Sequence, residues 1–189
     1  MNVSILLDAN ILYSAPMRDL FMQMSVLDLF AAKWSNDIHA EWINNLLKNN
    51  LSLTREKLER TKELMNSKTR DAVIENYSSL IPKIKGMPDP GDRHVVAAAI
   101  VGGCNFIITK NLRDFPEVAL IPHNIAAKHP DDFLFNVFES KPQIFVEAVR
   151  KVRARLKKPP LTASQYLAIL HKQELRKTSE ALMNYEYKL

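Results

Sequence analysis

A chain of 189 residues, 47% of them hydrophobic and 25% charged, can bury one α/β core and is not composed like a disordered protein. No run of about 18 apolar residues occurs, so we expect no membrane-spanning helix, and the single cysteine, Cys104, excludes an intrachain disulfide and a cysteine-based zinc cage. The first residues show no basic leader and no cleavable apolar segment, so we expect a cytoplasmic protein.

The net charge of +5 is unevenly distributed along the chain. Residues 1–140 contain 15 Lys or Arg and 17 Asp or Glu, whereas residues 141–189 contain 11 and 4. A basic segment of this kind indicates contact with a polyanion, most often a nucleic acid. A solvated helical surface would give the same pattern, and charge alone does not separate the two interpretations.

The first half of the chain predicts one strand followed by helices. Residues 3–7 form a short apolar run that is typical of a buried parallel strand and ends in a polar turn at 8–10. Apolar residues recur at helical spacing over 18–33, and the break at 34–37 offers caps for another helix. The charged region 54–80 predicts two further helices that cover the sheet.

The second half returns to strands. Asp89 can cap a helix that starts at Pro90 and stops at Gly102. Residues 104–109 predict a second strand, a polar loop follows at 110–116, and 118–122 predict a third strand. Because helices separate these strands, the sequence predicts a parallel α/β sheet.

A boundary is expected at His129-Pro130-Asp131-Asp132. Beyond it the pattern is helical, with one or two helices over 130–157 and a further pair over 161–189. We therefore expect one domain over residues 1–128 and a basic helical C-terminal extension over 129–189.

Acidic residues fall where the predicted strands end. Asp8 follows the first strand, Asn111 and Asp114 follow the strand 104–109, Asp92 opens a helix, and Glu41 lies on the polar face of another helix. Ligand sites of open parallel sheets form at the carboxyl ends of the strands. These residues are distant in sequence, but we expect them to meet on one rim.

Converging carboxylates repel one another unless a positive charge lies between them. A hard divalent cation with oxygen ligands, Mg²⁺ or Mn²⁺, suits such a site and can activate water for attack on a phosphate. His94 is interpreted as a helix-surface or packing residue rather than a ligand.

Each acid alone also has a purely structural interpretation. Asp8 could end a strand, Glu41 could be a solvated helix residue, and Asp114 could belong to a turn. Asp89 and Asp92 could cap a helix, and capping is the interpretation we favour for Asp89. Only the joint placement of the acids at strand ends favours a functional site.

Four ordered segments resemble PIN-domain nucleases. They are Leu6-Leu7-Asp8-Ala9-Asn10-Ile11-Leu12, the group Arg18-Asp19-Leu20, Trp34-Ser35 and Glu41, the segment Pro88 to Ala99, and the segment Ile107 to Pro116. The resemblance covers roughly residues 3–122. It implies a three-layer fold with a central parallel sheet flanked by helices, and cleavage of single-stranded RNA.

The resemblance also implies roles for individual residues. Asp8, Glu41 and Asp92 fall on the metal-binding acids of the family. Many members have an aspartate where this chain has Asn111, and Asp114 could supply the missing charge. Thr109, Asp89 and Asn10 are expected to support the site, Thr109 by orienting a carboxylate or water.

The tail is similar to the helical extension of some VapC-type toxins of bacterial toxin–antitoxin pairs. The likeness lies in residues 129–134, 153–156 and 158–162. It implies tRNA or ribosomal RNA as substrate, a cognate antitoxin and frequent homodimers. The tail could guide RNA through phosphate contacts, or it could hold the antitoxin or the dimer partner; the residues expected to contact RNA are Arg150, Lys151, Arg153, Arg155, Lys157 and Lys158.

The sequence therefore predicts a Mg²⁺-dependent endoribonuclease, with two rivals. A phosphatase-like hydrolase would use Asp8 as nucleophile, but it would need an acid where Asn10 stands. A non-catalytic RNA-binding module is favoured by the neutral Asn111.

Overall fold

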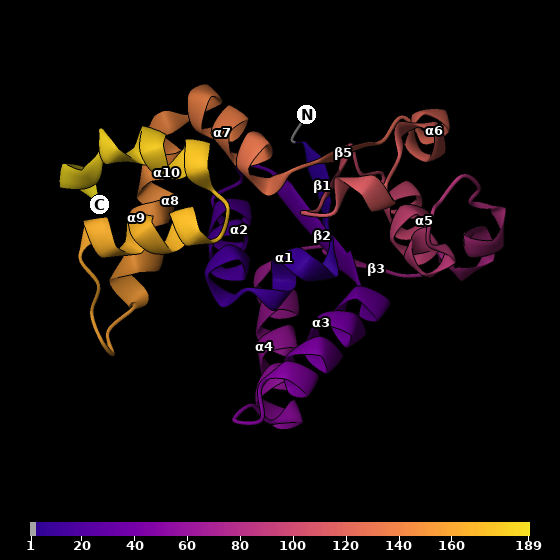
Figure 1. The fold of residues 1–189 in the computed structure, drawn as a ribbon, viewed down its shortest axis with the longest axis horizontal. Coiled ribbons are helices and arrows are strands. Elements are labelled where there is room, and N and C mark those ends of the chain that lie inside the picture. Colours follow the sequence, from indigo (N-terminus) through magenta and orange to yellow (C-terminus); the bar gives the residue numbers. More distant parts are fainter. Residues whose placement is uncertain (1–2) are drawn as a thin grey trace.

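The structure, a computed structural model, describes residues 3–189. Within these residues five parallel strands form one sheet in the order β3-β2-β1-β4-β5 (Figure 1). The strands are β1 (Ser4–Leu7), β2 (Ala31–Ser35), β3 (Val73–Ile74), β4 (Phe106–Ile108) and β5 (Ala126–Lys128). The predicted α/β fold with a central parallel sheet flanked by helices is confirmed.

Strand β1 occupies the centre of the sheet because its residues are apolar on both faces. Ile5, Leu6 and Leu7 are fully buried, as expected for a strand covered on both sides. Leu6 is in register with Lys33 of β2 and Ile107 of β4. Since all these strands are parallel, their carboxyl ends lie along the same edge.

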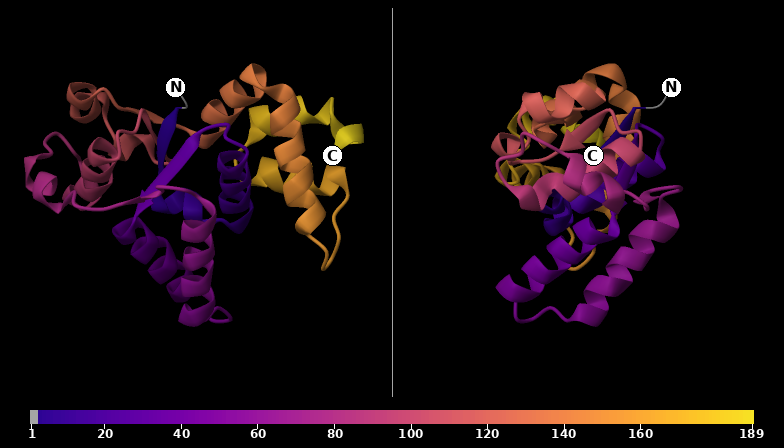
Figure 2. Two further views of the ribbon diagram at one scale, coloured as in Figure 1. Left: turned by 180° about the vertical axis from the view of Figure 1, so that it is seen from behind. Right: turned by 90° about the vertical axis from the view of Figure 1, so that its right-hand side faces the viewer.

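Helices and short 3₁₀ turns connect the strands. The helices are α1 (Ala9–Tyr13), α2 (Ala15–Val26), α3 (Asn36–Asn49), α4 (Arg55–Lys68), α5 (Arg93–Val101) and α6 (Glu117–Leu120). The 3₁₀ turns are η1 (Ser78–Lys83), η2 (Pro90–Asp92), η3 (Leu112–Asp114) and η4 (Ile121–His123). Helix α5 packs against β1, β2 and β4, and α3 and α4 project together from the sheet (Figure 2).

The last quarter of the chain is helical, as predicted. It contains α7 (Pro130–Ser140), α8 (Pro142–Arg155), α9 (Ala163–Lys172), α10 (Arg176–Met183) and the turn η5 (Glu186–Lys188). Helix α8 packs against α2, and α10 packs against α7 and α9. Figure 1 shows these helices at one end of the sheet, opposite α5 and α6. The division into domains at residue 128 stays a prediction.

Two predictions over the region 8–35 are wrong in detail. Residues 8–10 are not a simple turn, because Asp8 accepts a hydrogen bond from the Ala9 amide and thereby caps α1. The predicted helix over 18–33 ends at Val26. Asp28 adopts a left-handed backbone with φ 55°, which helices do not continue through, and the chain then enters β2.

Two further predictions are wrong, the second helix within 54–80 and the strand over 118–122. Region 54–80 contains one helix, α4, then the two-residue strand β3 and part of η1; Asp71, at φ 52°, turns the chain between helix and strand. The predicted strand 118–122 is instead α6 and η4. The edge strand comes later, as β5, after Asn124 reverses the chain at φ 56°.

Most of the remaining predicted elements are confirmed. They include the strands around 3–7 and 104–109 and the helix stop at Gly102. The helix predicted to start at Pro90 is divided in two, because Asp89 caps the 3₁₀ turn η2 and α5 begins only at Arg93. No helix in the part of the chain from residue 3 to 189 is long and apolar enough to cross a membrane.

Candidate functional site

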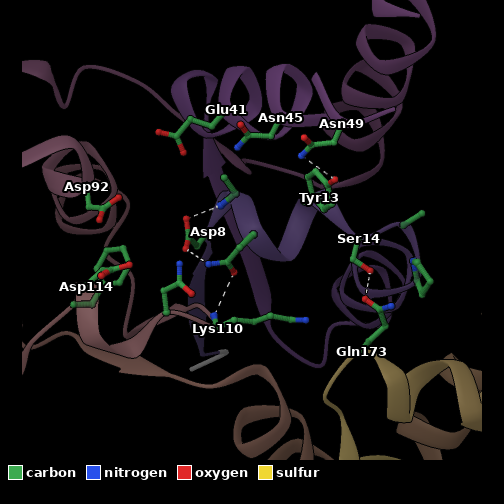
Figure 3. A pocket seen from close by; sticks show the side chains of 16 residues that line it. Asp8, Tyr13, Ser14, Glu41, Asn45, Asn49, Asp92, Lys110, Asp114 and Gln173 are labelled. Carbon is green, nitrogen blue, oxygen red and sulfur yellow. Dashed lines mark hydrogen bonds between the residues drawn. The ribbon is translucent and has the colours of Figure 1, made fainter. Parts of the chain in front are cut away.

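A cavity of about 720 Å³ opens at the carboxyl edge of the sheet. Its walls include Asp8, Glu41, Asp92, Asn111 and Asp114 (Figure 3). They come from the end of β1, helix α3, the η2–α5 junction and the loop after β4. The prediction that these distant residues share one rim is confirmed.

Asp8 is the most deeply placed of the acids, and its side chain is only 8% exposed. Its Oδ1 accepts a hydrogen bond from the Ala9 amide at 2.6 Å. Its Oδ2 accepts from Asn10 Nδ2 at 2.6 Å and from Thr109 Oγ1 at 2.7 Å. Three donors therefore fix the orientation of this carboxylate.

Burial raises the pKa of Asp8 to about 6, against the hydrogen bonds from Thr109 and Ala9, which lower the pKa. The nearby charges of Glu41 and Asp92 raise the pKa further. A buried carboxylate that also faces like charges stabilises a positive partner more than a solvated one would.

Asn10 ties the ends of β1 and β4 together. Its Nδ2 donates to Thr109 Oγ1 at 2.9 Å as well as to Asp8, and its Oδ1 accepts from the Lys110 amide at 3.2 Å. Thr109 Oγ1 also accepts from the Asn111 amide at 3.0 Å. Asn10 and Thr109 therefore lie where the sequence predicted supporting residues.

Glu41 is held by a partner that the sequence did not predict. Its Oε1 lies 2.8 Å from Nε2 of His94, which is buried on α5. Burial lowers the pKa of His94, but the hydrogen bond and charge of Glu41 outweigh it, and the pKa is raised overall. His94 is a packing residue, as interpreted from the sequence, and it also positions a carboxylate.

Asp89 caps a turn, which is the interpretation favoured from the sequence, whereas Asp92 faces the cavity. Asp89 Oδ1 accepts from the Gly91 amide at 2.7 Å and caps η2, and Asp89 is not among the residues that line the cavity. Asp92 lines the cavity and makes no capping bond. Partial burial, then the charges of Asp89, Asp114 and Glu41, raise the pKa of Asp92.

The residues fit a hard divalent cation. Among residues 3–189 no lysine or arginine forms an ion pair with Asp8, Asp92 or Asp114. Burial first, and then the charges of neighbouring acids, raise the pKa values of Asp8 and Asp92. Carboxylate and amide oxygens are the ligands that Mg²⁺ and Mn²⁺ prefer.

The carboxylates of the cavity are too far apart in this structure to bind one ion together. Within the described part of the chain, no three His, Cys, Asp or Glu side chains lie close enough together to hold one ion. Glu41, Asp92 and Asp114 are each partly exposed, whereas Asp8 is buried.

The six basic residues expected to contact RNA do not line this cavity. Two of them make internal contacts: Arg153 donates to the carbonyl oxygens of Leu161 and Leu189, and Arg155 donates to Gln23 Oε1. Arg150 and Lys151 pair with Glu147. Lys157 and Lys158 are exposed.

Several cavity residues were missed by sequence reasoning. They are Tyr13, Ser14, Asn45, Asn49, Lys110 and Gln173. Asn45 and Asn49 follow Glu41 at intervals of four residues, so a polar stripe on α3 could have indicated them. Gln173 carries no such signal, because only the packing of α9 brings it to the rim.

Comparison with known proteins agrees with this geometry. Residues 4–113 match the family model described as "PIN domain". Because this match covers more than half of the chain, the protein belongs to the PIN domain family. Residues 130–184 match the model described as "VapC50 C-terminal domain", so the resemblance to VapC-type proteins with a helical extension is confirmed.

One similar protein is "Putative ribonuclease VapC50" of Mycobacterium tuberculosis (strain ATCC 25618 / H37Rv). It is 44% identical over 61 residues, which cover 32% of this chain and 34% of the relative. The match thus spans about a third of that protein's length. No solved structure matches the chain significantly.

Proposed function

We propose that this protein is a metal-dependent endoribonuclease, with its active site in the acidic cavity. The observation that carries the proposal is the meeting of Asp8, Glu41, Asp92 and Asp114 in one cavity without a lysine or arginine paired to Asp8, Asp92 or Asp114 in the described chain. Membership of the PIN domain family and the similarity to a protein named as a ribonuclease support it.

In this proposal Asp8, Glu41 and Asp92 hold Mg²⁺ or Mn²⁺, and Asn111 or Asp114 assists by positioning water or a second ion. The bound metal would polarise the scissile phosphate and lower the pKa of a water molecule. Thr109 and Asn10 keep the Asp8 carboxylate oriented, and His94 keeps Glu41 near the cavity.

The substrate and partners are also proposals. We infer single-stranded or structured RNA, such as tRNA or ribosomal RNA, as the substrate, and a cognate antitoxin that blocks the cavity. A homodimer is a further expectation. These inferences rest on the family and on the similarity to VapC50.

We propose residues 1–128 as the nuclease unit and residues 129–189 as its accessory extension. Lys157 and Lys158 are exposed and could meet RNA phosphates directly. Arg150 and Lys151 lie on the same helical surface, but each would have to give up its ion pair with Glu147 first. Arg153 and Arg155 would have to give up internal hydrogen bonds first. Phosphate contacts would make RNA binding weaken steeply with salt.

The test is an incubation of purified protein with total RNA, with and without Mg²⁺ or Mn²⁺, beside Asp8→Asn. We expect metal-dependent cleavage that is lost in the variant. Cleavage that persists in Asp8→Asn would indicate a contaminating nuclease and would leave the proposed activity of this protein without support. Turnover of a phosphomonoester without RNA cleavage would instead support a phosphatase-like hydrolase.

A non-catalytic RNA-binding module is the second candidate, because Asn111 contributes no charge at a position where many PIN nucleases have an acid. It predicts RNA binding without cleavage under every metal condition.

A further inference from the structure

The acidic cavity has a second end without carboxylates. We call it the uncharged end, because the ammonium of Lys110, which lines the cavity, is paired there with Glu174. Figure 3 shows Asp92 and Asp114 on one side of Asp8, and Tyr13, Asn49, Ser14 and Gln173 on the other. The chemistry of the cavity therefore changes along its length, from carboxylates to amides and hydroxyls. The acids and the metal they would hold occupy only the first part.

Amide side chains dominate the uncharged end, and they keep hydrogen-bonding groups available. Within residues 3–189 Asn45 makes no side-chain hydrogen bond. Asn49 donates only to the Tyr13 hydroxyl, at a long 3.4 Å. Gln173 accepts from Ser14 Oγ at 2.5 Å through Oε1, which leaves its Nε2 as a donor. Such amides both donate and accept, so they can pair with polar edges.

Asn45 and Asn49 point into the cavity from the same helix that carries Glu41. With intervals of four residues, the three side chains form one stripe along α3 (Figure 3). A substrate whose phosphate lies near Glu41 would therefore extend along this stripe toward Asn49.

Charge argues against a phosphate at the uncharged end. Lys110 is the one lysine or arginine among the described residues that line the cavity, and its Nζ is already 3.2 Å from Glu174 Oε1. Lysine and arginine supply the electrostatic attraction that dominates phosphate binding, and amides or hydroxyls alone add only hydrogen bonds. An uncharged wall of amides suits the neutral part of a nucleotide, its base or ribose.

Tyr13 adds an aromatic ring to the same wall. Unpaired bases of single-stranded RNA stack on aromatic side chains and offer their edges to hydrogen bonds. Asparagine and glutamine can make paired hydrogen bonds to a base edge, which discriminate between bases. The wall thus combines the two contacts by which proteins read an unpaired base.

We propose that Tyr13, Asn45, Asn49 and Gln173, which we call the amide subsite, bind the base of a nucleotide next to the scissile phosphate and give the enzyme a base preference. This inference rests on the proposed ribonuclease activity and deepens it. It assigns substrate selection to α3 and the α1–α2 junction, with α9 contributing through Gln173.

The experiment compares wild type with the double variant Asn45→Ala/Asn49→Ala. The matched control is Asn44→Ala, because Asn44 is exposed on the same helix, accepts a hydrogen bond from Arg55 and does not line the cavity. Alanine favours helix, so these exposed changes should leave the protein folded. The substrates are short single-stranded oligoribonucleotides that differ in one base beside the cleaved bond.

Wild type should cleave one base context faster than the others, and Asn44→Ala should do the same. The double variant should lose about tenfold in kcat/KM on the preferred oligonucleotide and cleave all contexts at similar rates. Its affinity for Mn²⁺ in calorimetry should equal that of wild type, since the acids are intact.

The two proposals fail in different ways. Cleavage without base preference in wild type, or a preference that survives in the double variant, would overturn the amide subsite and leave the ribonuclease standing. If wild type cleaves no RNA with any metal, the ribonuclease proposal fails. In that case, fluorescence anisotropy with the same oligonucleotides tests whether the amide subsite binds RNA. About tenfold weaker binding in the double variant alone supports the subsite, and equal binding overturns it.

Discussion

At the scale of single residues, the site depends on how Asp8 is held. Its carboxylate is buried, accepts three hydrogen bonds and faces two further acids. Thr109 Oγ1 has the central position in this arrangement, since it donates to Asp8 and accepts from both Asn10 and the Asn111 amide. One hydroxyl therefore links the end of β1 to the loop after β4.

Thr109→Val removes this hydroxyl at nearly constant volume. The loss of its hydrogen bond should raise the pKa of Asp8 further, because that bond favours the charged carboxylate. We expect metal affinity and RNA cleavage to fall by about 10- to 100-fold, the usual effect of removing a group that orients a ligand. Calorimetry with Mn²⁺ and a cleavage assay measure the two effects.

Thr109→Ser is the matched control, because it keeps the hydroxyl and loses only a methyl group. It should restore most of the metal affinity. If serine and valine were equally impaired, packing rather than the hydrogen bond to Asp8 would explain the loss.

At the scale of elements, one face of helix α3 lines the cavity and the opposite face packs in the protein interior. Its outer stripe presents Glu41, Asn45 and Asn49 to the cavity. Its inner face buries His39 between Trp34 and Trp42, where Nδ1 accepts from Trp42 Nε1 at 2.9 Å and Nε2 lies 3.1 Å from Asn66 Oδ1. This network ties α3 to β2 and α4.

His39 gives the fold a pH dependence of defined sign. Burial lowers its pKa from 6.5 to about 4, and protonation of Nδ1 would break the bond from Trp42. Between these pH values the unfolded chain binds a proton that the folded protein does not. The contribution of His39 to stability is therefore complete above pH 6.5 and is lost as the pH falls toward 4.

We expect the stability advantage of wild type over His39→Gln to shrink by about 2 kcal/mol between pH 7 and pH 5. Urea denaturation of both proteins at each pH measures this difference, and the comparison cancels the other titrating groups. A difference that stays constant across the range would show that His39 does not titrate as described.

The elements also show what sequence patterns can and cannot predict. Strand β1 was predictable because Ile5, Leu6 and Leu7 form an uninterrupted apolar run before Asp8. Strands β3 and β5 have only two and three residues, too few for a periodicity, and pairing with neighbours defines them. Strand β2 was hidden because Phe30 continues the helical spacing of α2 past the left-handed Asp28.

The same limit applies to the site. Asp8, Asp92 and Asp114 were predictable from their positions next to strands and a helix start, and Glu41 from the resemblance to PIN nucleases. The partnership of His94 with Glu41, and of Glu174 with Lys110, was not predictable, because each joins segments more than 50 residues apart. Such contacts depend on packing that no local pattern records.

At the scale of the whole molecule, the helical extension (residues 129–189) contributes side chains to the hydrophobic core. Phe133 of α7 is 4% exposed, and its ring centroid lies 5.2 Å from that of Phe30 and 6.1 Å from that of Phe106. Glu174, beyond α9, pairs with Lys110 beside the cavity. The extension therefore meets both the sheet and the rim of the site.

Phe133→Ala should destabilise the protein by about 3 to 5 kcal/mol, because it opens a cavity between α7, β4 and Phe30, the residue before β2. Phe135→Ala on the same helix is the matched control, since Phe135 is half-buried and pairs with Phe138 alone among the described aromatic contacts. Chemical denaturation should give a much smaller loss for the control. Equal losses would contradict a shared core at Phe133.

The central claim is that the converging acids form a metal-dependent ribonuclease centre. The most direct measurement is the cleavage rate of one single-stranded RNA after chelation and after return of Mg²⁺ or Mn²⁺. It compares wild type with Asp8→Asn, Glu41→Gln and Asp92→Asn, and uses Glu174→Gln, a change at the rim outside the acid cluster, as control.

We predict that chelation abolishes cleavage, that either metal restores it in wild type and Glu174→Gln, and that each of the three acid variants remains at least about 100-fold slower. Cleavage that survives chelation, or that proceeds at the wild-type rate in Asp8→Asn or Asp92→Asn, would contradict the account.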